Sequence, residues 1–392
     1  MAELQARWHR AMTEIPRKAW QELTGPAGLP FYGWPWLHAL ERSGSIVPRQ
    51  GWQPCHLSLW RQERLIAVAP LYLKGHSYGE FVFDQSFAQL AGQLGQRYYP
   101  KLVGMSPLSP VQGYRFHTDP GEDGVEITAL MLELIDRFCR EQKIFSCNFL
   151  YVDPEWQPSA EAAGCATWLN QQSLWTNDGF SSFEDYLAGF NANQRRNIRR
   201  ERRSIAAAGL KVTPLAGSEI SAAMLERMHH FYAQHCSRWG AWGSKYLSEE
   251  FFHVDALELR EHLVLFSAHG GDPHEPVAMS LCVRHGESLW GRYWGSDREV
   301  ENLHFEVCYY APIEWAIGQG IRGFDPGAGG SHKRRRGFLA EPRASLHRWQ
   351  DPGFDRLLRR WLPAANAQML EEIEAENAEL PFSRRELPLG AC

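Results

Sequence analysis

The chain has 392 residues, of which 44% are hydrophobic and 22% are charged, as is ordinary for a globular protein. The formal net charge of −5 argues that the protein as a whole is not a polyanion-binding protein. The length exceeds that of one ordinary core and predicts two domains of about 150–200 residues each. No apolar run of about 18 residues occurs, so we expect no membrane-spanning helix.

The N-terminal segment is charged throughout and lacks an apolar stretch, so we expect no signal peptide. The eight cysteines are scattered, without a CxxC pair, and predict neither a zinc site nor a disulfide framework. A reduced, cytoplasmic setting fits this usage. His229, His230, His235 and Cys236 lack a completing ligand at a known spacing, so we expect no metal.

In the first half, residues 55–74 predict two strands joined by a polar turn at 62–64. Apolar residues at helical spacing predict a helix over 125–143, and 144–152 predicts a buried strand. Ser181 or Ser182 is expected to cap the next helix. A basic helix is then expected over 193–208, ended by Gly209.

In the second half, strands are expected at 262–269, 276–284 and 288–295, followed by a helix from about Phe305 and a closing strand at 321–326. Pro312 should kink that helix or start a new one. The order strand, strand, helix, strand thus occurs in both halves, and we interpret it as a tandem duplication. The expected domains are 1–180, 181–352 with the basic helix 193–208, and 353–392 with a C-terminal helix and tail.

The basic helix carries two sets of arginines at i, i+4, i+7 spacing: Arg195, Arg199 and Arg202, and Arg196, Arg200 and Arg203. Like charges at this spacing repel one another, and Glu201 relieves only part of that repulsion. The pattern favours an anionic partner, a solvated face, or pairing with the acidic C-terminal helix, and the sequence leaves these three open. Under the first interpretation, Arg195, Arg196, Arg199 and Arg203 would bind phosphate.

The segment GAGGSHKRRRG is rich in glycine and basic residues. Gly327, Gly329 and Gly330 would let backbone N–H groups approach an anion, with Lys333 adding charge. A loop without a ligand is the alternative interpretation. The segment is not a Walker A sequence, so ATP hydrolysis is not indicated. Arg292 and His332 complete the candidate ligand-binding residues.

Four residues near this segment are candidates for acid–base chemistry. Asp325 ends an apolar strand, where ligands of α/β proteins commonly bind and where a carboxylate must find donors. Glu306 lies in the first turn of the expected helix, a position that also stabilises the helix end. His304 and Tyr310 are weaker candidates, because single histidines and helical aromatics commonly serve packing.

The stretch FEVCYYAPIEWAIGQGIRGFDPGAGGSHKRRRGF resembles the hallmark of FemAB-like proteins, a bacterial group labelled peptidoglycan biosynthesis/recognition. The segments YYPKLV and PLSPVQGYRF resemble a second motif of that group. The resemblance runs from about Trp36 to Trp349. These proteins are similar to the GNAT acyltransferase superfamily.

The resemblance implies an α/β (α+β) fold of tandem GNAT-like acyl-CoA N-acyltransferase domains, with mixed sheets flanked by helices. It also implies that RRNIRRERRSIAAAGLKV occupies the place of a basic segment preceding the second domain. FDPGAGG matches the family's closing strand at Asp325 and Gly327. The Q/R-x-x-G-x-G/A motif that holds the pyrophosphate of acetyl-CoA is absent, which favours aminoacyl-tRNA over acetyl-CoA as the acyl donor.

The resulting expectation is an N-acyltransferase that transfers an aminoacyl group to an amine acceptor in a cell-wall-related reaction, without a tightly bound cofactor. Asp325 would accept the amine proton or hold the ammonium. Two alternatives stay open: a non-catalytic recognition protein for an anionic sugar–peptide or RNA, and an acetyl-CoA-dependent N-acetyltransferase. The sequence leaves open whether the protein is a monomer or a homodimer.

Overall fold

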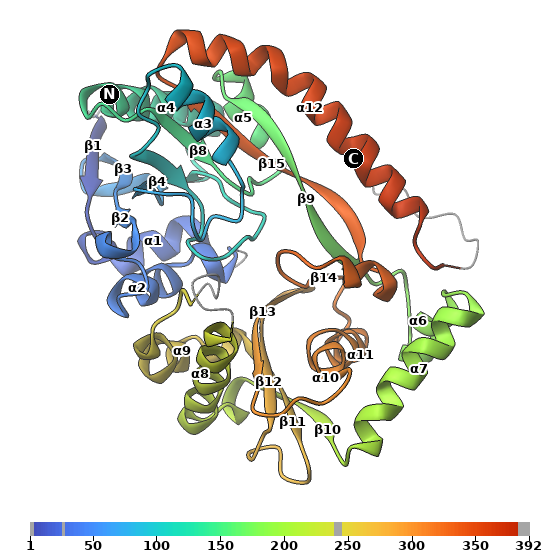
Figure 1. The fold of residues 1–392 in the computed structure, drawn as a ribbon. Coiled ribbons are helices and arrows are strands. Elements are labelled where there is room, and N and C mark those ends of the chain that lie inside the picture. The colour runs from blue at the N-terminus through green and yellow to red at the C-terminus, as the bar shows by residue number, and fades with distance from the viewer. Residues whose placement is uncertain (1–3, 26–27, 239–244, 383–392) are drawn as a thin grey trace. The chain divides into compact units, whose positions relative to one another are not determined.

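The computed structural model describes residues 4–25, 28–238 and 245–382 (Figure 1). The chain forms two compact units, each built from separate segments. Unit 1 comprises Met1–Gln171, Tyr246–Phe251 and Pro342–Glu371, and unit 2 comprises Gln172–Lys245, Phe252–Glu341 and Glu372–Cys392. Each unit is a group of residues that pack together, and such packing does not show where an independent domain begins. The boundaries expected after residues 180 and 352 therefore stay predictions.

Unit 1 contains two sets of strands. One is a four-stranded sheet in the order β1 (Leu4–His9), β3 (His56–Arg61), β4 (Arg64–Ala69), β7 (His117–Thr118). The other has the order β15 (Leu339–Trp349), β8 (Ser146–Phe149), β6 (Lys101–Gly104), β5 (Tyr72–Lys74), β2 (Trp52–Pro54). β6 and β8 run parallel, whereas β5 pairs with β6 and β15 with β8 in the antiparallel sense.

The strand pair expected at 55–74 is present as β3 and β4, but the pair belongs to the four-stranded sheet. The strand beside β8 is instead β6, which the sequence-based interpretation overlooked. β6 has only four residues and begins with a lysine, so it lacks the length and pattern that identify a strand. The helix expected at 125–143 is confirmed as α4 (Gly124–Glu141), whose first N–H groups are capped by the Asp123 side chain.

The remaining helices of unit 1 are α1 (Arg17–Thr24), α2 (Trp34–Arg42), α3 (Gln85–Gln93), α5 (Gln157–Ala162) and the first part of α12 (Pro352–Ala378). α12 confirms the expected C-terminal helix. Its Phe354, Leu358 and Leu362 recur at helical spacing and are buried against Phe87 and Trp349. The part of the expected tail beyond residue 382 lies outside the described residues.

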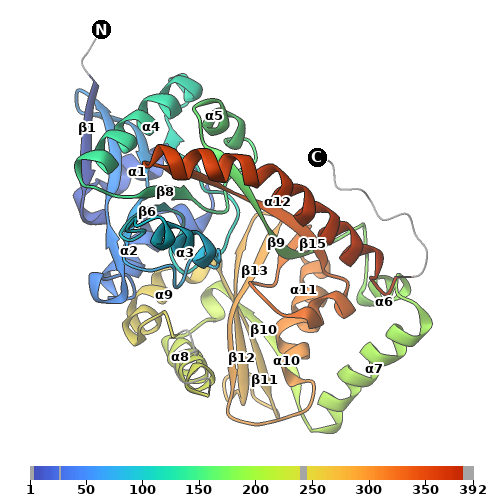
Figure 2. The same ribbon diagram turned by 45° about the horizontal axis from the view of Figure 1, so that its top comes forward.

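The sheet of unit 2 has the order β10 (Lys211–Ala216), β11 (Leu263–His269), β12 (Ala278–His285), β13 (Ser288–Ser296), β14 (Gly323–Asp325), β9 (Ala166–Thr176). β13 and β14 run parallel, and the crossover between them is helical. Helix α8 (Ala222–Ser237) packs on one face of this sheet and the crossover helix on the other, as Figures 1 and 2 show. The strands expected in the second half are therefore confirmed.

Helix α6 (Phe183–Ala188) begins at Ser182, whose side chain accepts the Asp185 N–H, as the sequence predicts. Helix α7 (Ala192–Ala207) is the basic helix, and Gly209 behind it has a φ of 72°, which favours glycine. Short α9 (Ala256–Glu258) precedes β11. The local signals of capping and termination thus predict both central helices.

The crossover helix consists of three segments: α10 (Leu303–Phe305), the π-helical segment η8 (Glu306–Tyr310) and α11 (Ala311–Gly318). Pro312 is the second residue of α11, so its missing N–H lies in a first turn, where helices tolerate proline. The expected new helical start is confirmed. None of the described helices combines the length and the apolar character that crossing a membrane would require.

Candidate functional site

The candidate site of unit 2 lies where the pairing of β13 with β14 ends. The two strands pair from Ser288 and Gly323 to Trp290 and Asp325, and β13 then continues alone on this side to Ser296. Its register with β12 shifts here, so that Arg292 is the extra residue of a β-bulge. Bulges re-aim side chains and are frequent beside active sites.

The Arg292 guanidinium turns toward the carboxylate at the end of β14. Its Nη2 lies 3.2 Å from Asp325 Oδ2, and its Nη1 donates to the Gly291 carbonyl at 2.8 Å. The other oxygen of Asp325 accepts the Gly327 N–H at 2.7 Å. Gly327 has a φ of 86°, and a Cβ there would lie 3.1 Å from the Gly291 carbonyl oxygen. Glycine is therefore required where the turn passes the bulge.

Lys333, from the segment η9 (Ser331–Arg336), is the third charged residue of this group. Its Nζ donates to the Gly327 carbonyl at 2.5 Å. The side chain is buried, with 2% of the residue exposed. Burial lowers the pKa of the Lys333 amine to about 8, and the nearby Asp325 carboxylate limits that fall. The predicted residues Arg292, Asp325, Gly327 and Lys333 therefore come together, whereas Gly329 and Gly330 lie in the exposed part of the turn.

Two helices hold η9 in position. Gln194 of α7 donates to the Arg335 carbonyl at 2.6 Å, and Tyr186 of α6 donates to the Arg336 carbonyl at 2.7 Å. The buried Arg336 side chain donates to Glu201 at 2.7 Å and stacks on Phe305, with its Cζ 3.4 Å from the ring centroid. The segment that carries Lys333 is thus fixed on both its backbone and its side chains.

Tyr310 bonds the same Glu201 carboxylate as Arg336, because its hydroxyl donates to Glu201 Oε2 at 2.5 Å. Burial raises the pKa of the Tyr310 hydroxyl, so the group stays protonated. Glu306 instead receives the Arg202 guanidinium at 2.9–3.2 Å, and Arg202 also bonds Glu314 at 2.6 Å. Burial raises the pKa of Glu306, and the charge of Arg202 opposes that rise. The side chains of Glu306 and Tyr310 thus hold α7 against η8.

The two histidine candidates lie in an aromatic group. His332 Nε2 lies 2.9 Å from the Tyr309 hydroxyl, and the His304 and His332 ring centroids are 5.5 Å apart. Burial lowers the pKa of His304 to about 3, so its imidazole is neutral at physiological pH. Burial and the charges of Arg336 and Lys333 lower the pKa of His332 as well.

The arginines of α7 have three different environments. Arg195 donates to the Phe190 carbonyl and Arg199 pairs with Glu184 at 2.6 Å. Arg196, Arg200 and Arg203 are exposed, and within residues 4–25, 28–238 and 245–382 their side chains make no hydrogen bond or ion pair. Only the second set of arginines thus keeps its charge available to a ligand.

A polar cleft of about 880 Å3 lies between α7 and η9. Its lining includes the cations Arg200, Arg334, Arg335 and Arg336, the amides Asn193 and Asn197, and Ser331 and His332. Glu379, near the end of the described chain, also lines it. The cleft and the Asp325 group flank the same segment, η9, whose residues contribute to both. Its basic character suits a phosphate-bearing ligand.

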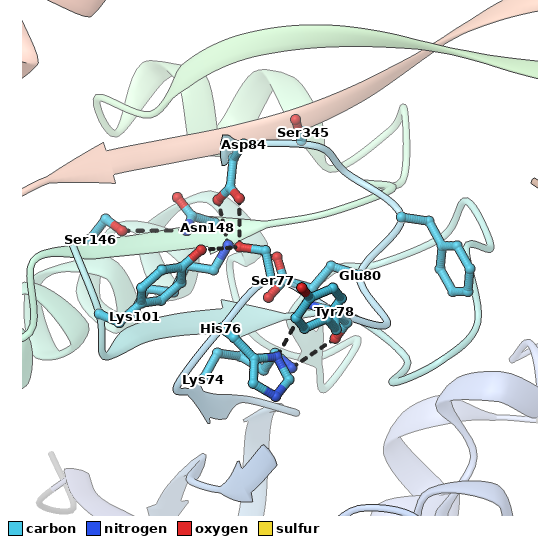
Figure 3. Close-up of polar contacts among 12 residues, drawn as sticks. Lys74, His76, Ser77, Tyr78, Glu80, Asp84, Lys101, Ser146, Asn148 and Ser345 are labelled. Atoms are coloured by element: carbon cyan, nitrogen blue, oxygen red, sulfur yellow. Dashed lines mark hydrogen bonds and ion pairs between the residues drawn. The ribbon is translucent and has the colours of Figure 1, made fainter. Parts of the chain in front are cut away.

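Unit 1 holds a second polar cluster, which the sequence-based interpretation missed (Figure 3). Lys74 of β5 and Lys101 of β6 lie directly opposite each other, and neither is exposed to solvent. Like charges in this arrangement destabilise a sheet unless anions offset them. Lys101 donates to Glu80 at 2.6 Å and also pairs with Asp84.

Asp84 is further held by the Ser77 hydroxyl at 2.5 Å and the Tyr98 hydroxyl at 2.6 Å. Among the described residues, Lys74 donates only to the Tyr78 carbonyl, at 3.0 Å, and its Nζ lies 3.4 Å from the Trp52 ring centroid. Burial lowers the pKa of Lys74 to about 7. Burial likewise raises the pKa of Glu80 to about 7, and Glu80 Oε1 has no hydrogen-bond partner within the described residues.

The sequence held one signal for this cluster. YYPKLV, noted only as a family motif, supplies Tyr98 and Lys101, and a lysine beginning an apolar strand predicts a buried partner. Its partners lie in the segment 75–84, where no pattern of spacing marks them. In unit 2, the sequence-based interpretation gave Glu201 no part in the site, because its partners Tyr310 and Arg336 lie 109 and 135 positions away.

Comparisons with solved structures find chains of similar fold. The chain is similar to FemX, at 11% identity over 91% of this chain and all of that one, with a TM-score of 0.51. It also matches a tandem GNAT protein from the clavulanic acid biosynthesis pathway, at 12% identity over 89% of this chain and 99% of that one, with a TM-score of 0.43. L-PGS from Bacillus licheniformis matches at 9% identity over 76% of this chain and 86% of that one, with a TM-score of 0.46.

A search of curated proteins finds no match. The model of the FemAB-like family, described as peptidoglycan biosynthesis/recognition, matches residues 11–384. That match spans both of the motifs quoted above and both units. The chain therefore belongs to the FemAB-like family.

Proposed function

We propose that the protein is an N-acyltransferase that transfers an aminoacyl group from aminoacyl-tRNA to an amine of a peptidoglycan precursor, in the cytoplasm. The observation that carries the proposal is the group formed by Arg292, Asp325 and Lys333 at the end of the β13–β14 pairing, next to residues that line a basic cleft. The family description supports a substrate related to peptidoglycan.

In the proposed reaction, the acceptor amine attacks the ester carbonyl of the donor. A C–N bond forms, the ester C–O bond breaks, and the amine proton leaves through Asp325 to the departing oxygen. Such a transfer depends mainly on positioning and on donors for the developing oxyanion. The bulge turns the charged Arg292 guanidinium toward the reacting ester carbonyl, so we assign Arg292 the role of stabilising the developing oxyanion.

Phosphates of the donor would lie in the polar cleft, where Arg200 offers side-chain charge and Asn193 and Asn197 offer neutral donors. Within the proposal, Lys333 holds the turn at Gly327 and adds positive charge beside Asp325. Arg196 and Arg203 would contribute more distant attraction.

The test is turnover. The protein is incubated with tRNA charged with a labelled amino acid and with a panel of muramyl-peptide acceptors, and products are followed by mass spectrometry. We expect the acceptor mass to rise by one amino-acid residue, with a product stable to mild base as an amide is. Binding of the same ligands without product across the panel would overturn the transferase proposal in favour of a recognition protein.

A second measurement separates the donors. An acetyl-CoA-dependent enzyme would be stabilised against thermal unfolding by millimolar CoA, because a ligand that binds the folded state raises its stability. We expect no such shift, and an increase in thermal stability with charged tRNA. A shift with CoA alone would reassign the donor.

A further inference from the structure

A second cavity lies along a different face of α7. It has a volume of about 720 Å3 and is lined by α6, α7, β10 and the crossover helix. Arg199, Arg203 and Ala206 of α7 face it at i, i+4, i+7 spacing, whereas Asn193, Asn197 and Arg200 face the polar cleft. The helix therefore separates two cavities of different chemistry. We call this second cavity the α7 groove.

The floor of the α7 groove is apolar. It is formed by aliphatic and aromatic side chains from every element around it: Phe183, Leu187, Ile205, Leu210, Val212 and Trp315. Four of these are buried in the core of unit 2, so the floor is part of a packed structure and needs no rearrangement to form. Cavities of about 300–1,000 Å3 with such linings are typical of sites for small ligands.

Most charges around the α7 groove are already neutralised within it. Arg199 pairs with Glu184, and Arg202 pairs with Glu306 and Glu314. The two remaining cations are Arg203 and Lys211. Both are exposed, and their side chains have no ion pair or hydrogen bond in the part of the chain that the structure describes. They flank the turn from α7 into β10, so the available positive charge lies at that end.

We propose that the α7 groove binds the hydrocarbon chain of an amphiphile whose phosphate head is held by Arg203 and Lys211. The apolar floor accounts for the chain, since burying apolar surface is the main gain available there. The two unpaired cations account for the head, because a phosphate monoester carries nearly two negative charges and accepts several hydrogen bonds. This site does not depend on the proposed transferase activity.

An extended peptide fits the α7 groove less well. A peptide would bury N–H and C=O groups, which need partners once they leave water. Apart from Arg203 and Lys211, the charged side chains of the groove wall are paired with one another, and Pro214 of the edge strand β10 offers no N–H. A hydrocarbon chain makes no such demand.

The test uses dodecyl phosphate, kept below its micelle concentration, and isothermal titration calorimetry on the full chain. We expect saturable binding with one site and a negative heat-capacity change, the mark of apolar burial. Butyl phosphate, which keeps the head but loses most of the chain, should bind at least about tenfold more weakly. Dodecyltrimethylammonium, which reverses the head charge, should bind at least about tenfold more weakly as well.

Three variants locate the site. Ala206→Trp places a large side chain in the groove from an exposed helix position and should weaken dodecyl phosphate binding by about tenfold or more. The double variant Arg203→Glu/Lys211→Glu should weaken it similarly through the head. The matched control is Arg196→Glu, which reverses an exposed, unpaired arginine of the same helix outside both linings and should leave affinity unchanged.

Circular dichroism checks that each variant stays folded. Equal affinity of the wild type and all three variants would place the amphiphile elsewhere and overturn the proposal, as would failure of the wild type to bind. Because the readout is direct binding, the outcome is independent of whether aminoacyl transfer is detected.

Discussion

Both units place charged side chains beside a pair of parallel strands, but at opposite ends of the pair. In unit 1, Lys101 is the first residue of β6, and its carboxylate partners enclose it completely. In unit 2, Asp325 is the last residue of β14 and is buried as well, but the segment η9, whose Lys333 bonds the turn after it, also lines a cleft. Ligands of α/β sheets bind at the carboxyl ends of strands.

The comparison indicates different roles for similar chemistry. A sealed cluster has no access to substrate, so its charges act on folding stability, whereas charges beside a cleft can act on a ligand. Matched substitutions should therefore change folding stability in the unit 1 cluster and the transfer rate in the unit 2 group. The predictions below test that separation, beginning with the largest expected effect.

Asp325→Asn should reduce aminoacyl transfer by about 100-fold to 10,000-fold, the contribution typical of a positioned general base. The amide keeps the shape of the side chain and can still accept from Gly327, but it removes the charge that pairs with buried Arg292, so some stability should be lost and the rate refers to the folded fraction. Transfer rate and thermal unfolding are measured on the same preparation. Undiminished transfer would remove Asp325 from the proposed mechanism.

Asp84→Asn is the matched change in unit 1. It removes one charged partner of a buried lysine, and breaking such a pair destabilises a protein by about 3–5 kcal/mol. Chemical denaturation should report this loss of unfolding free energy, while the transfer rate of the folded fraction stays near that of the wild type. A large loss of rate without loss of stability would instead give the unit 1 cluster a role in catalysis.

Lys74 and Glu80 predict opposite pH dependences. The folded-state pKa of Lys74, about 7, is depressed from its ordinary value of 10.5, so stability is lost as pH falls from 10.5 to about 7. The folded-state pKa of Glu80, about 7, is raised from 4.5, so stability is lost as pH rises from 4.5 to about 7. Together the two groups give a stability minimum near pH 7.

Two single variants resolve these contributions. Lys74→Met should stabilise the protein at pH 7 by about 1–4 kcal/mol, since apolar replacement of buried charges is often stabilising, and the gain should fade toward pH 10. Glu80→Gln also removes a charged partner of Lys101, so its stability relative to the wild type should be lowest near pH 5 and should rise toward pH 7, where the raised pKa of Glu80 no longer favours the wild type. Urea denaturation across this range measures both. Parallel pH profiles for the two variants would contradict the assigned titrations.

Arg200→Gln should have the smallest effect. It removes one cation from the polar cleft, so tRNA binding should weaken about tenfold or less, and the slope of log affinity against log salt should fall by about one. Fluorescence anisotropy with labelled tRNA at several salt concentrations measures the slope. The control is Arg196→Gln, which lies outside the cleft lining and should change the slope less. Equal changes in both variants would show that the cleft has no special part in binding.

Much of the local structure could be predicted because its causes are local. Ser182 caps α6 through a bond to a residue three positions away, and Gly209 adopts the conformation that ends α7. Pro312 lies in the first turn of α11, where its missing N–H is tolerated. β6 was missed for the complementary reason: its four residues form a strand only because β5 and β8 pair with it on either side.

The candidate site was predictable only in part. The end of β14 and the glycine turn indicated Asp325, Gly327 and Lys333 as neighbours, since they are close along the chain. Glu306 and Tyr310 precede Asp325 by 19 and 15 positions, yet their side chains form hydrogen bonds with residues of α7 instead. The unit 1 cluster joins residues of two strands and a loop, so spacing alone gave no indication of it.

The family motifs, the basic helix and the strand that ends in Asp325 can be read from the amino-acid sequence, because they depend on neighbouring residues and on the period of apolar side chains. Which charges remain available to a ligand depends on the packing of distant segments. Arg202 pairs with Glu306, 104 positions away, whereas Arg203, the next residue, stays unpaired beside an apolar groove. The two residues differ by about 100° around one helix, so they lie on different faces. What packs on each face then determines whether the arginine is paired.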